Sequence, residues 1–200
     1  MKLHFDDMII YVWNGVYPPS DDTFLVLDNV KLNGKEFVLD IGTGTGILAI
    51  KYALDGCYVI GVDISKKAVR NALLNAKINN VLERVQFVCA DTILSFRHRC
   101  EFDVIVMNPP YLPSTGNPGI DEPLWNGGPN GISLTLRVIK NIDELLAENG
   151  RLYFIASSLS KYDTLISNLT SMGFKVSVIA KKRFWFEELF LVEARRNASY

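Results

Sequence analysis

The chain has 200 residues, enough for one domain with a buried core, and its formal net charge is only −1 at pH 7. This charge does not favour binding to nucleic acid or to an acidic membrane surface. No apolar stretch approaches the roughly 20 residues that a membrane span needs. The three cysteines, Cys57, Cys89 and Cys100, lie in or beside apolar runs and suit reduced thiols better than a disulfide framework or a metal site. We therefore expect a cytoplasmic protein that holds no metal.

Strand-like and helix-like segments alternate along the chain, which predicts parallel βαβ units. The strands are almost continuously apolar, so the sheet should be covered by helices on both faces. The last two strands are joined only by residues 181–187 and should therefore pair antiparallel. The predicted fold is an α/β domain with a mostly parallel sheet of seven strands. We expect strands at 36–40, 58–63, 85–90, 102–107, 151–156, 174–180 and 188–193, and helices at 46–54, 65–79, 134–146 and 161–172.

Acidic residues mark the ends of three of these strands. Asp40 precedes the run Gly42-Thr43-Gly44-Thr45-Gly46, Asp63 ends the second strand, and Asp91 follows the third. A dinucleotide site needs G-x-G-x-x-G, but here the third glycine comes one residue early, and Asp40 would repel a pyrophosphate. A single aspartate after a strand is usually a turn residue. Three at the same sheet edge favour a site for a nucleoside without phosphates, with Asp63 on the ribose hydroxyls and Asp91 near the adenine amino group.

The tetrapeptide Asn108-Pro109-Pro110-Tyr111 follows the strand at 102–107 directly. Two consecutive prolines fix φ and have no N–H group, so the turn is stiff and its carbonyls are free to accept hydrogen bonds. Asn108 and Tyr111 on such a rim can hold a small planar amide or amine. The loop at 109–131 is rich in glycine and proline, and loops of this length are often functional.

In this order and spacing, these segments resemble the class I S-adenosylmethionine-dependent methyltransferases, and the N-P-P-Y form resembles the branch that methylates amide or exocyclic amino nitrogen. The stretches VYPPSDDTFL (16–25) and WNGGPNG (125–131) resemble signatures of the HemK-type protein N5-glutamine methyltransferases, in their compact archaeal and eukaryotic form. Bacterial members carry a helical domain before the glycine loop, whereas 39 residues precede Asp40 here. The resemblance implies one Rossmann-like domain over 1–200, with a cofactor-capping segment at 1–35 and a core at 36–200.

The resemblance also implies roles for individual residues. The Asn108 side-chain oxygen and the Pro109 carbonyl would each accept one hydrogen of the substrate amide, and Tyr111 would stack on that amide. The methyl donor would be S-adenosylmethionine, with S-adenosylhomocysteine as the product. Thr23 would face the methionine end of the cofactor, although it can equally belong to a helix N-terminus at 20–23. The residues expected at the cofactor are Tyr17, Thr23, Asp40, Gly42, Gly44, Gly46, Asp63, Ile64, Asp91, Thr92 and Asn108.

The implied substrate is a translation release factor, methylated on the glutamine of its Gly-Gly-Gln loop. A DNA or RNA adenine or cytosine amino-methyltransferase stays an alternative, because N-P-P-Y can hold an exocyclic amine equally well. The net charge of −1 disfavours it. A lysine-methylating variant and a non-catalytic cofactor-binding subunit also stay open. Compact members often work with a small zinc-binding activator protein at a sheet edge, and the apolar strand residues 58–60 are expected near such an edge.

Overall fold

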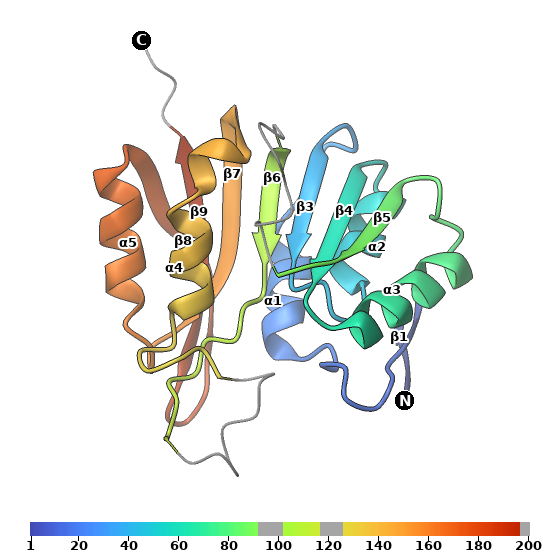
Figure 1. Cartoon of the computed structure of the whole chain (residues 1–200), viewed down its shortest axis with the longest axis horizontal. Helices are drawn as coiled ribbons and strands as arrows, with labels where there is room; N and C mark the ends of the chain where they lie inside the picture. Colours follow the sequence, from blue (N-terminus) through green and yellow to red (C-terminus); the bar gives the residue numbers. More distant parts are fainter. Residues whose placement is uncertain (92–101, 117–125, 197–200) are drawn as a thin grey trace.

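The computed structural model describes residues 1–91, 102–116 and 126–196. A seven-stranded sheet in the order β5-β4-β3-β6-β7-β9-β8 forms its centre (Figure 1). All neighbours from β5 to β7 pair parallel, whereas β9 pairs antiparallel with both β7 and β8. This confirms the predicted α/β fold with its mostly parallel sheet. The strands are β3 (Phe37–Ile41), β4 (Tyr58–Asp63), β5 (Val85–Cys89), β6 (Phe102–Met107), β7 (Leu146–Ser157), β8 (Phe174–Arg183) and β9 (Glu188–Arg196).

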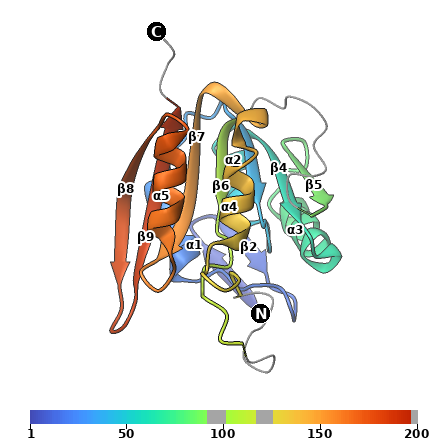
Figure 2. The ribbon, with the colours of Figure 1, turned by 60° about the vertical axis from the view of Figure 1, so that its left-hand side comes forward.

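Helices cover both faces of the sheet, as the apolar strands predict (Figures 1 and 2). Alternate side chains of β6 enter the two cores: Val104 and Val106 face one core, and Ile105 and Met107 face the other. The helices α1 (Asp21–Asn29), α2 (Ile47–Leu54) and α3 (Lys66–Ile78) pack on the first core, and α4 (Ser133–Ile139), the 3-10 turn η2 (Ile142–Glu144) and α5 (Tyr162–Ser171) pack on the second.

A short N-terminal hairpin, β1 (Lys2–Phe5) and β2 (Met8–Tyr11), lies against α3 and was not expected from the sequence. Three asparagines one helical turn apart on α3 hold it. The backbone N–H groups of Ile9, Tyr11 and Trp13 donate to the side-chain oxygens of Asn79, Asn75 and Asn71, each at 2.9 Å.

These three amides also donate back to the segment that they hold. The Asn75 amide donates to the carbonyls of Tyr11 at 2.9 Å and Thr45 at 2.8 Å, so it joins the hairpin to the glycine loop. The asparagines therefore pair the backbone of β2 as a neighbouring strand would, and they fix the N-terminal segment on the core.

Two sequence-based boundaries are wrong. The helix expected at 134–146 ends at Ile139, and β7 begins at Leu146 rather than at Arg151. The Leu145 carbonyl accepts from Phe102 N (2.9 Å), and Leu146 pairs with Phe102 at the start of β6, so these residues extend the sheet instead of the helix. Over such a short stretch, apolar residues fit a helix face and a buried strand equally well, so the sequence pattern alone cannot distinguish the two.

Leu73 on α3 is 51% exposed, because asparagines and alanines form the packed side of this helix. The strand at Tyr58–Asp63 lies one position inside the sheet, and the edge strand is β5. None of the helices in the described part of the chain has the length and apolar character needed to cross a lipid bilayer.

Replacing the central asparagine should destabilise the fold strongly. Asn75→Ala leaves the N–H of Tyr11 and the carbonyl of Thr45 buried without this partner, so we expect a loss of about 2–4 kcal/mol in the free energy of unfolding. Denaturant titration measures the loss. The control is Asn168→Ala, whose amide donates to Thr164 of its own helix. Equal losses in the two variants would contradict a special role for Asn75.

Candidate active site

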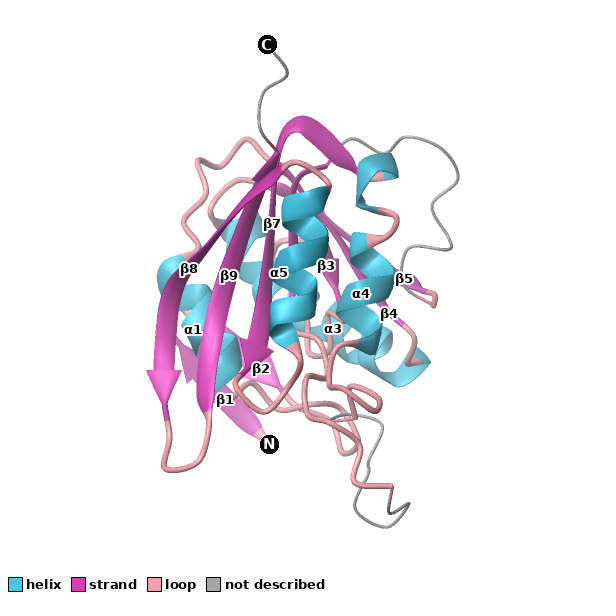
Figure 3. Ribbon diagram, turned by 90° about the vertical axis from the view of Figure 1, so that its left-hand side faces the viewer, coloured by secondary structure: helices cyan, strands magenta, loops and turns pink. Residues whose placement is uncertain are grey.

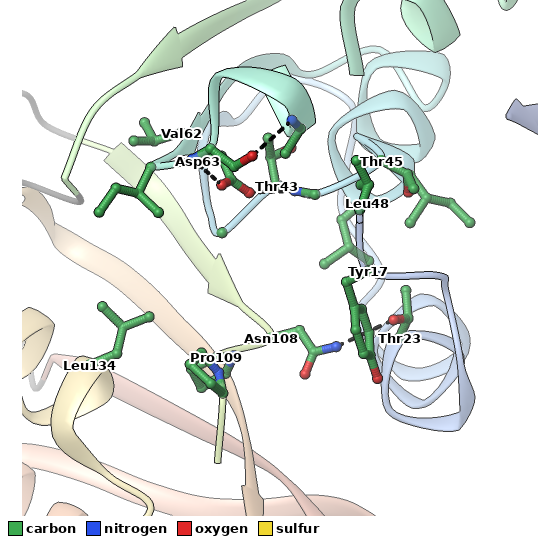
Figure 4. Close-up of a pocket in the computed structure, with 18 of the residues that line it drawn as sticks. Tyr17, Thr23, Thr43, Thr45, Leu48, Val62, Asp63, Asn108, Pro109 and Leu134 are labelled. Atoms are coloured by element: carbon green, nitrogen blue, oxygen red, sulfur yellow. Dashed lines mark hydrogen bonds between the residues drawn. The ribbon is translucent and has the colours of Figure 1, made fainter. Parts of the chain in front are cut away.

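A pocket of about 250 Å³ opens at the carboxyl ends of β3, β4 and β6 (Figure 4). Its walls come from the N-terminal segment, the glycine loop, the ends of β4 and β5, the N-P-P-Y turn and α4. Asp40 and Gly46 do not reach these walls, and Thr92 lies outside the described residues. The predicted site residues that do line the pocket are Tyr17, Thr23, Gly42, Gly44, Asp63, Ile64, Asp91, Asn108, Pro109 and Tyr111.

Asp63 ties the glycine loop to the end of β4. Its carboxylate accepts from Gly44 N at 2.9 Å and from Ser65 N at 2.8 Å (Figure 4). Burial raises the pKa of Asp63, and these two backbone N–H groups oppose the shift by stabilising the charged form. The loop is therefore shaped around a carboxylate that faces the pocket and is held from behind.

Asp40 and Gly46 support the loop from below. Asp40 is fully enclosed and accepts from the Thr43 hydroxyl at 2.6 Å. Burial raises the pKa of Asp40 to about 7, although the Thr43 hydrogen bond opposes the shift. Gly46 has φ +81°, and a Cβ there would lie 2.8 Å from the Cβ of Ala72 on α3. Glycine is needed here because α2 and α3 approach closely at this point.

A buried carboxylate, Asp22, joins the N-terminal helix to the N-P-P-Y turn. It accepts from the hydroxyls of Tyr17 at 2.6 Å and Tyr111 at 3.1 Å, and from the backbone and hydroxyl of Thr23 at 2.6 and 3.1 Å. Burial, and then the charge of Asp22, raise the pKa of both tyrosines, so they remain neutral hydrogen-bond donors. Ser20, the N-cap of α1, makes no side-chain capping bond. Asp22 thus serves the pocket as well as the first turn of the helix.

Asn108 carries a hydrogen-bond acceptor that is buried but unused. Its Nδ2 donates to the Thr23 hydroxyl at 3.3 Å, which turns the amide toward the pocket between Pro109 and Tyr17 (Figure 4). Its Oδ1 is buried and has no hydrogen-bond partner among the described residues. Leaving a buried acceptor unpaired costs about 1–3 kcal/mol, so a ligand that donates an N–H group to Oδ1 would bind favourably here.

The segment at 126–131 supports the N-P-P-Y turn. Gly127 N donates to the Leu112 carbonyl at 2.8 Å, and a Cβ on Gly127 would lie 2.6 Å from the Pro110 carbonyl oxygen. A Cβ on Gly131 would collide with the Tyr111 carbonyl. Gly127 and Gly131 of WNGGPNG are therefore needed because the two segments pack backbone to backbone. Trp125 lies outside the described residues.

Sequence reasoning missed the contributions of Asp22 and Arg137. Arg137 on α4 lines the pocket and pairs with Asp91, with Nη2 2.6 Å from Oδ1 and Nη1 3.3 Å from Oδ2. A helical arginine 46 residues from its partner gives no signal in the sequence. Asp22 could have been predicted as a site residue, because it directly precedes Thr23 in the signature stretch at 16–25. The described residues contain no group of three or more His, Cys, Asp or Glu side chains that could hold a metal ion.

Solved structures agree with the fold. One chain of the E. cuniculi Mtq2–Trm112 complex matches with a TM-score of 0.70 and 22% identity, over 91% of this chain and 99% of that one. That complex is described as responsible for the methylation of the eRF1 translation termination factor. The T. thermophilus 16S rRNA N2 G1207 methyltransferase RsmC, solved with AdoMet and guanosine, matches with a TM-score of 0.75 and 18% identity, over 98% of this chain and 50% of that one. At these identities the matches establish the fold alone.

Sequence relatives establish the family as well as the fold. Residues 18–109 match the family model of ribosomal protein L11 methyltransferase (PrmA). The human methyltransferase HEMK2 is 27% identical over 92% of each chain. The putative protein N5-glutamine methyltransferase MJ0928 of Methanocaldococcus jannaschii is 37% identical over 90% of this chain and 92% of its own length. With a relative this similar over nearly its whole length, the chain belongs to the HemK-type protein N5-glutamine methyltransferases, a family of class I S-adenosylmethionine-dependent methyltransferases.

Proposed function

We propose that this protein methylates the side-chain amide nitrogen of a glutamine in the Gly-Gly-Gln loop of a translation release factor. The observation that carries the proposal is the buried Oδ1 of Asn108, which lines the pocket next to Pro109 and has no hydrogen-bond partner in the part of the chain that the structure describes. A glutamine amide has two N–H donors on one planar nitrogen and fits such an acceptor. Relatives named release factor glutamine methyltransferases, including that of Thermodesulfovibrio yellowstonii at 28% identity over 98% of this chain, support the same substrate. A release factor as substrate would place the reaction in the cytoplasm.

S-adenosylmethionine supplies a methyl group bound to a positively charged sulfur. The donor set of the pocket fits this molecule, because its carboxylates suit a nucleoside with positive charge and its pocket-lining arginine, Arg137, is paired with Asp91. We propose that Asp63 accepts from the ribose hydroxyls, that Asp91 lies at the adenine end, and that Gly42 and Gly44 bring the backbone close. Ile64 would cover the adenine with apolar surface. The predicted role of Thr92 at the adenine stays a prediction.

The remaining residues predicted at the cofactor fall into two groups. We propose that Tyr17 and Thr23 close over the methionine end, since both line the pocket and both are held by Asp22. Asp40 and Gly46 act indirectly, because they shape the glycine loop from below. In this scheme residues 1–35 cap the cofactor, 36–200 form the Rossmann-like core, and both belong to one methyltransferase domain.

An amide nitrogen is a poor nucleophile because its lone pair is delocalised into the carbonyl. The Asn108 Oδ1 and the Pro109 carbonyl would each accept one of its hydrogens, which orients the nitrogen and favours the electron shift at the transition state. Tyr111, kept neutral by burial and by Asp22, would stack on the amide plane. Such alignment can lower the barrier by up to about 7–11 kcal/mol in ideal cases. The methylated nitrogen then loses a proton to solvent without a dedicated base.

We also propose a small activator protein as a partner. On the described part of the sheet, β5 pairs with β4 alone and leaves an open edge. An unpaired strand edge can bind an added strand. The Mtq2 neighbour was solved in a complex with Trm112, which supports a partner of this kind.

Removal of the Asp63 carboxylate should weaken cofactor binding. Asp63→Ala loses a charged acceptor for the ribose and releases the N–H of Gly44, so we expect S-adenosylmethionine affinity to fall about 10-fold to 100-fold. Isothermal titration calorimetry measures the affinity. Asp55→Ala is the control, because Asp55 pairs with Lys51 at 2.6 Å at the C-terminal end of α2, outside the pocket. A carboxylate unimportant to the cofactor would leave both variants like the wild type.

Asn108→Ala should abolish methyl transfer while sparing the cofactor. It removes the free acceptor, so we expect kcat to fall by about 10²–10³ with the dissociation constant of S-adenosylmethionine changed by less than roughly threefold. Single-turnover assays with labelled cofactor, together with calorimetry, separate the two effects. Asn168→Ala again serves as the control. Equal rates for Asn108→Ala and the wild type would refute the mechanism, whereas a wild type without activity would support the non-catalytic alternative.

The identity of the substrate can be tested directly. The protein, with a co-expressed activator where needed, is incubated with labelled S-adenosylmethionine and a purified release factor. We expect label on the wild-type release factor and none when the glutamine of its Gly-Gly-Gln loop is replaced by alanine. Label that survives this replacement would contradict the proposed site. Label that nuclease removes from a cell extract would instead support the nucleic-acid alternative.

A further inference from the structure

Two neighbouring aromatic side chains are exposed at the turn between β8 and β9. Trp185 is 101% exposed and Phe186 is 81% exposed. Scattered apolar residues are common on protein surfaces, but a pair on one turn marks a binding surface more often than it serves the fold. The β8–β9 turn lies at the same end of the sheet as the loop after β6, close to α1 (Figures 2 and 3).

The turn borders a second hollow that adjoins the active-site pocket. Trp185 and Phe186 line this hollow together with Tyr17, Asp22 and Tyr111. The last three residues also line the pocket that holds Asn108. The two spaces thus share one wall. Of the residues that the structure describes, only Tyr17, Asp22 and Tyr111 are common to the hollow at Trp185 and Phe186 and the pocket at Asn108.

The charges around the hollow favour a polypeptide over a phosphate backbone. The hairpin carries basic residues, but Lys182 pairs with Asp21 of α1 at 2.7 Å. Asp21, Asp22 and Glu187 bring carboxylates to the same hollow, and Glu187 is held there by the hydroxyl of Ser157 at 2.6 Å. These carboxylates would repel the phosphates of a nucleic acid, so a polypeptide segment without acidic side chains is the better occupant.

The turn is also held in one shape. Phe184 N donates to the Glu187 carbonyl at 2.7 Å, which closes the turn on both sides of the aromatic pair. The Lys182–Asp21 ion pair joins the hairpin to α1. A surface that is rigid before binding loses less conformational entropy when a partner binds. The backbone that carries the aromatic pair is therefore held beside the pocket.

We propose that Trp185 and Phe186 bind the uncharged segment of the substrate protein that flanks the methylated glutamine. The β8–β9 turn is then the docking element that presents this glutamine to Asn108. This inference rests on the proposed function and deepens it. It assigns recognition of the substrate protein to the β8–β9 turn and methyl transfer to the N-P-P-Y loop. An apolar side chain or the flat peptide groups of the substrate would pack on the two rings.

The test compares Trp185→Ala and Phe186→Ala with the wild type in steady-state methylation of a purified release factor. We expect KM for the release factor to rise about 10-fold in each variant, as for exposed aromatic anchors in interfaces, with kcat within roughly twofold. The affinity for S-adenosylmethionine, measured by calorimetry, should not change. Met172→Ala is the control, because Met172 is 37% exposed just before the start of β8, at the opposite end of that strand from the turn. Circular dichroism checks that all variants fold.

Each other outcome overturns the inference in a recognisable way. An active wild type with unchanged KM in both aromatic variants rejects the docking surface and leaves the proposed function standing. Equal rises in KM in the aromatic variants and in Met172→Ala reject a specific role for the turn. A wild type that does not methylate the release factor rejects the proposed function and this occupant with it. Single-stranded RNA that binds the wild type but not Trp185→Ala, with KM unchanged, would assign the turn to nucleic acid.

Discussion

The active site depends on one buried carboxylate. Asp22 is 2% exposed, and it accepts hydrogen bonds from its near neighbours Tyr17 and Thr23 and from Tyr111, 89 residues further along the chain. Through Thr23 it also sets the direction of the Asn108 amide. A buried charge is tolerated only when hydrogen bonds surround it, so the carboxylate and its donors hold one another in place. The start of α1 and the loop after β6 are therefore positioned together rather than separately.

The two sides of the pocket are supported by contacts between backbone groups and segments from other parts of the chain. On one side, the asparagines of α3 pair with the backbone of β2 and keep the N-terminal segment on the core. On the other side, Gly127 and Gly131 let the segment at 126–131 pack against the N-P-P-Y turn. In both cases a segment from another part of the chain supplies hydrogen-bond partners for backbone groups that would otherwise lack them. The pocket keeps its shape because both rims are tied to the sheet.

The sheet could be predicted from the sequence because its strands are short apolar runs with clear ends. The strands at 58–63 and 102–107 have the predicted bounds, and each is followed at once by site residues. The hairpin β1–β2 was missed because it has only four residues in each strand and its partners are asparagine side chains. The end of α4 was missed because Leu145 and Leu146 fit an apolar helix face as well as a strand.

The sequence by itself determined the α/β order of the fold and the methyltransferase family, and it predicted the cofactor class and a site at the strand ends, because the Gly-rich run, the strand-end aspartates and N-P-P-Y are local signals. Only the tertiary structure decided how these residues face one another. It placed Asp40 behind the loop and Asp63 at the pocket, it joined Asp22 to Tyr111, and it brought Trp185 beside both. Such contacts join residues tens of positions apart, and their geometry follows from packing and from the need to pair buried polar groups, which no local pattern encodes.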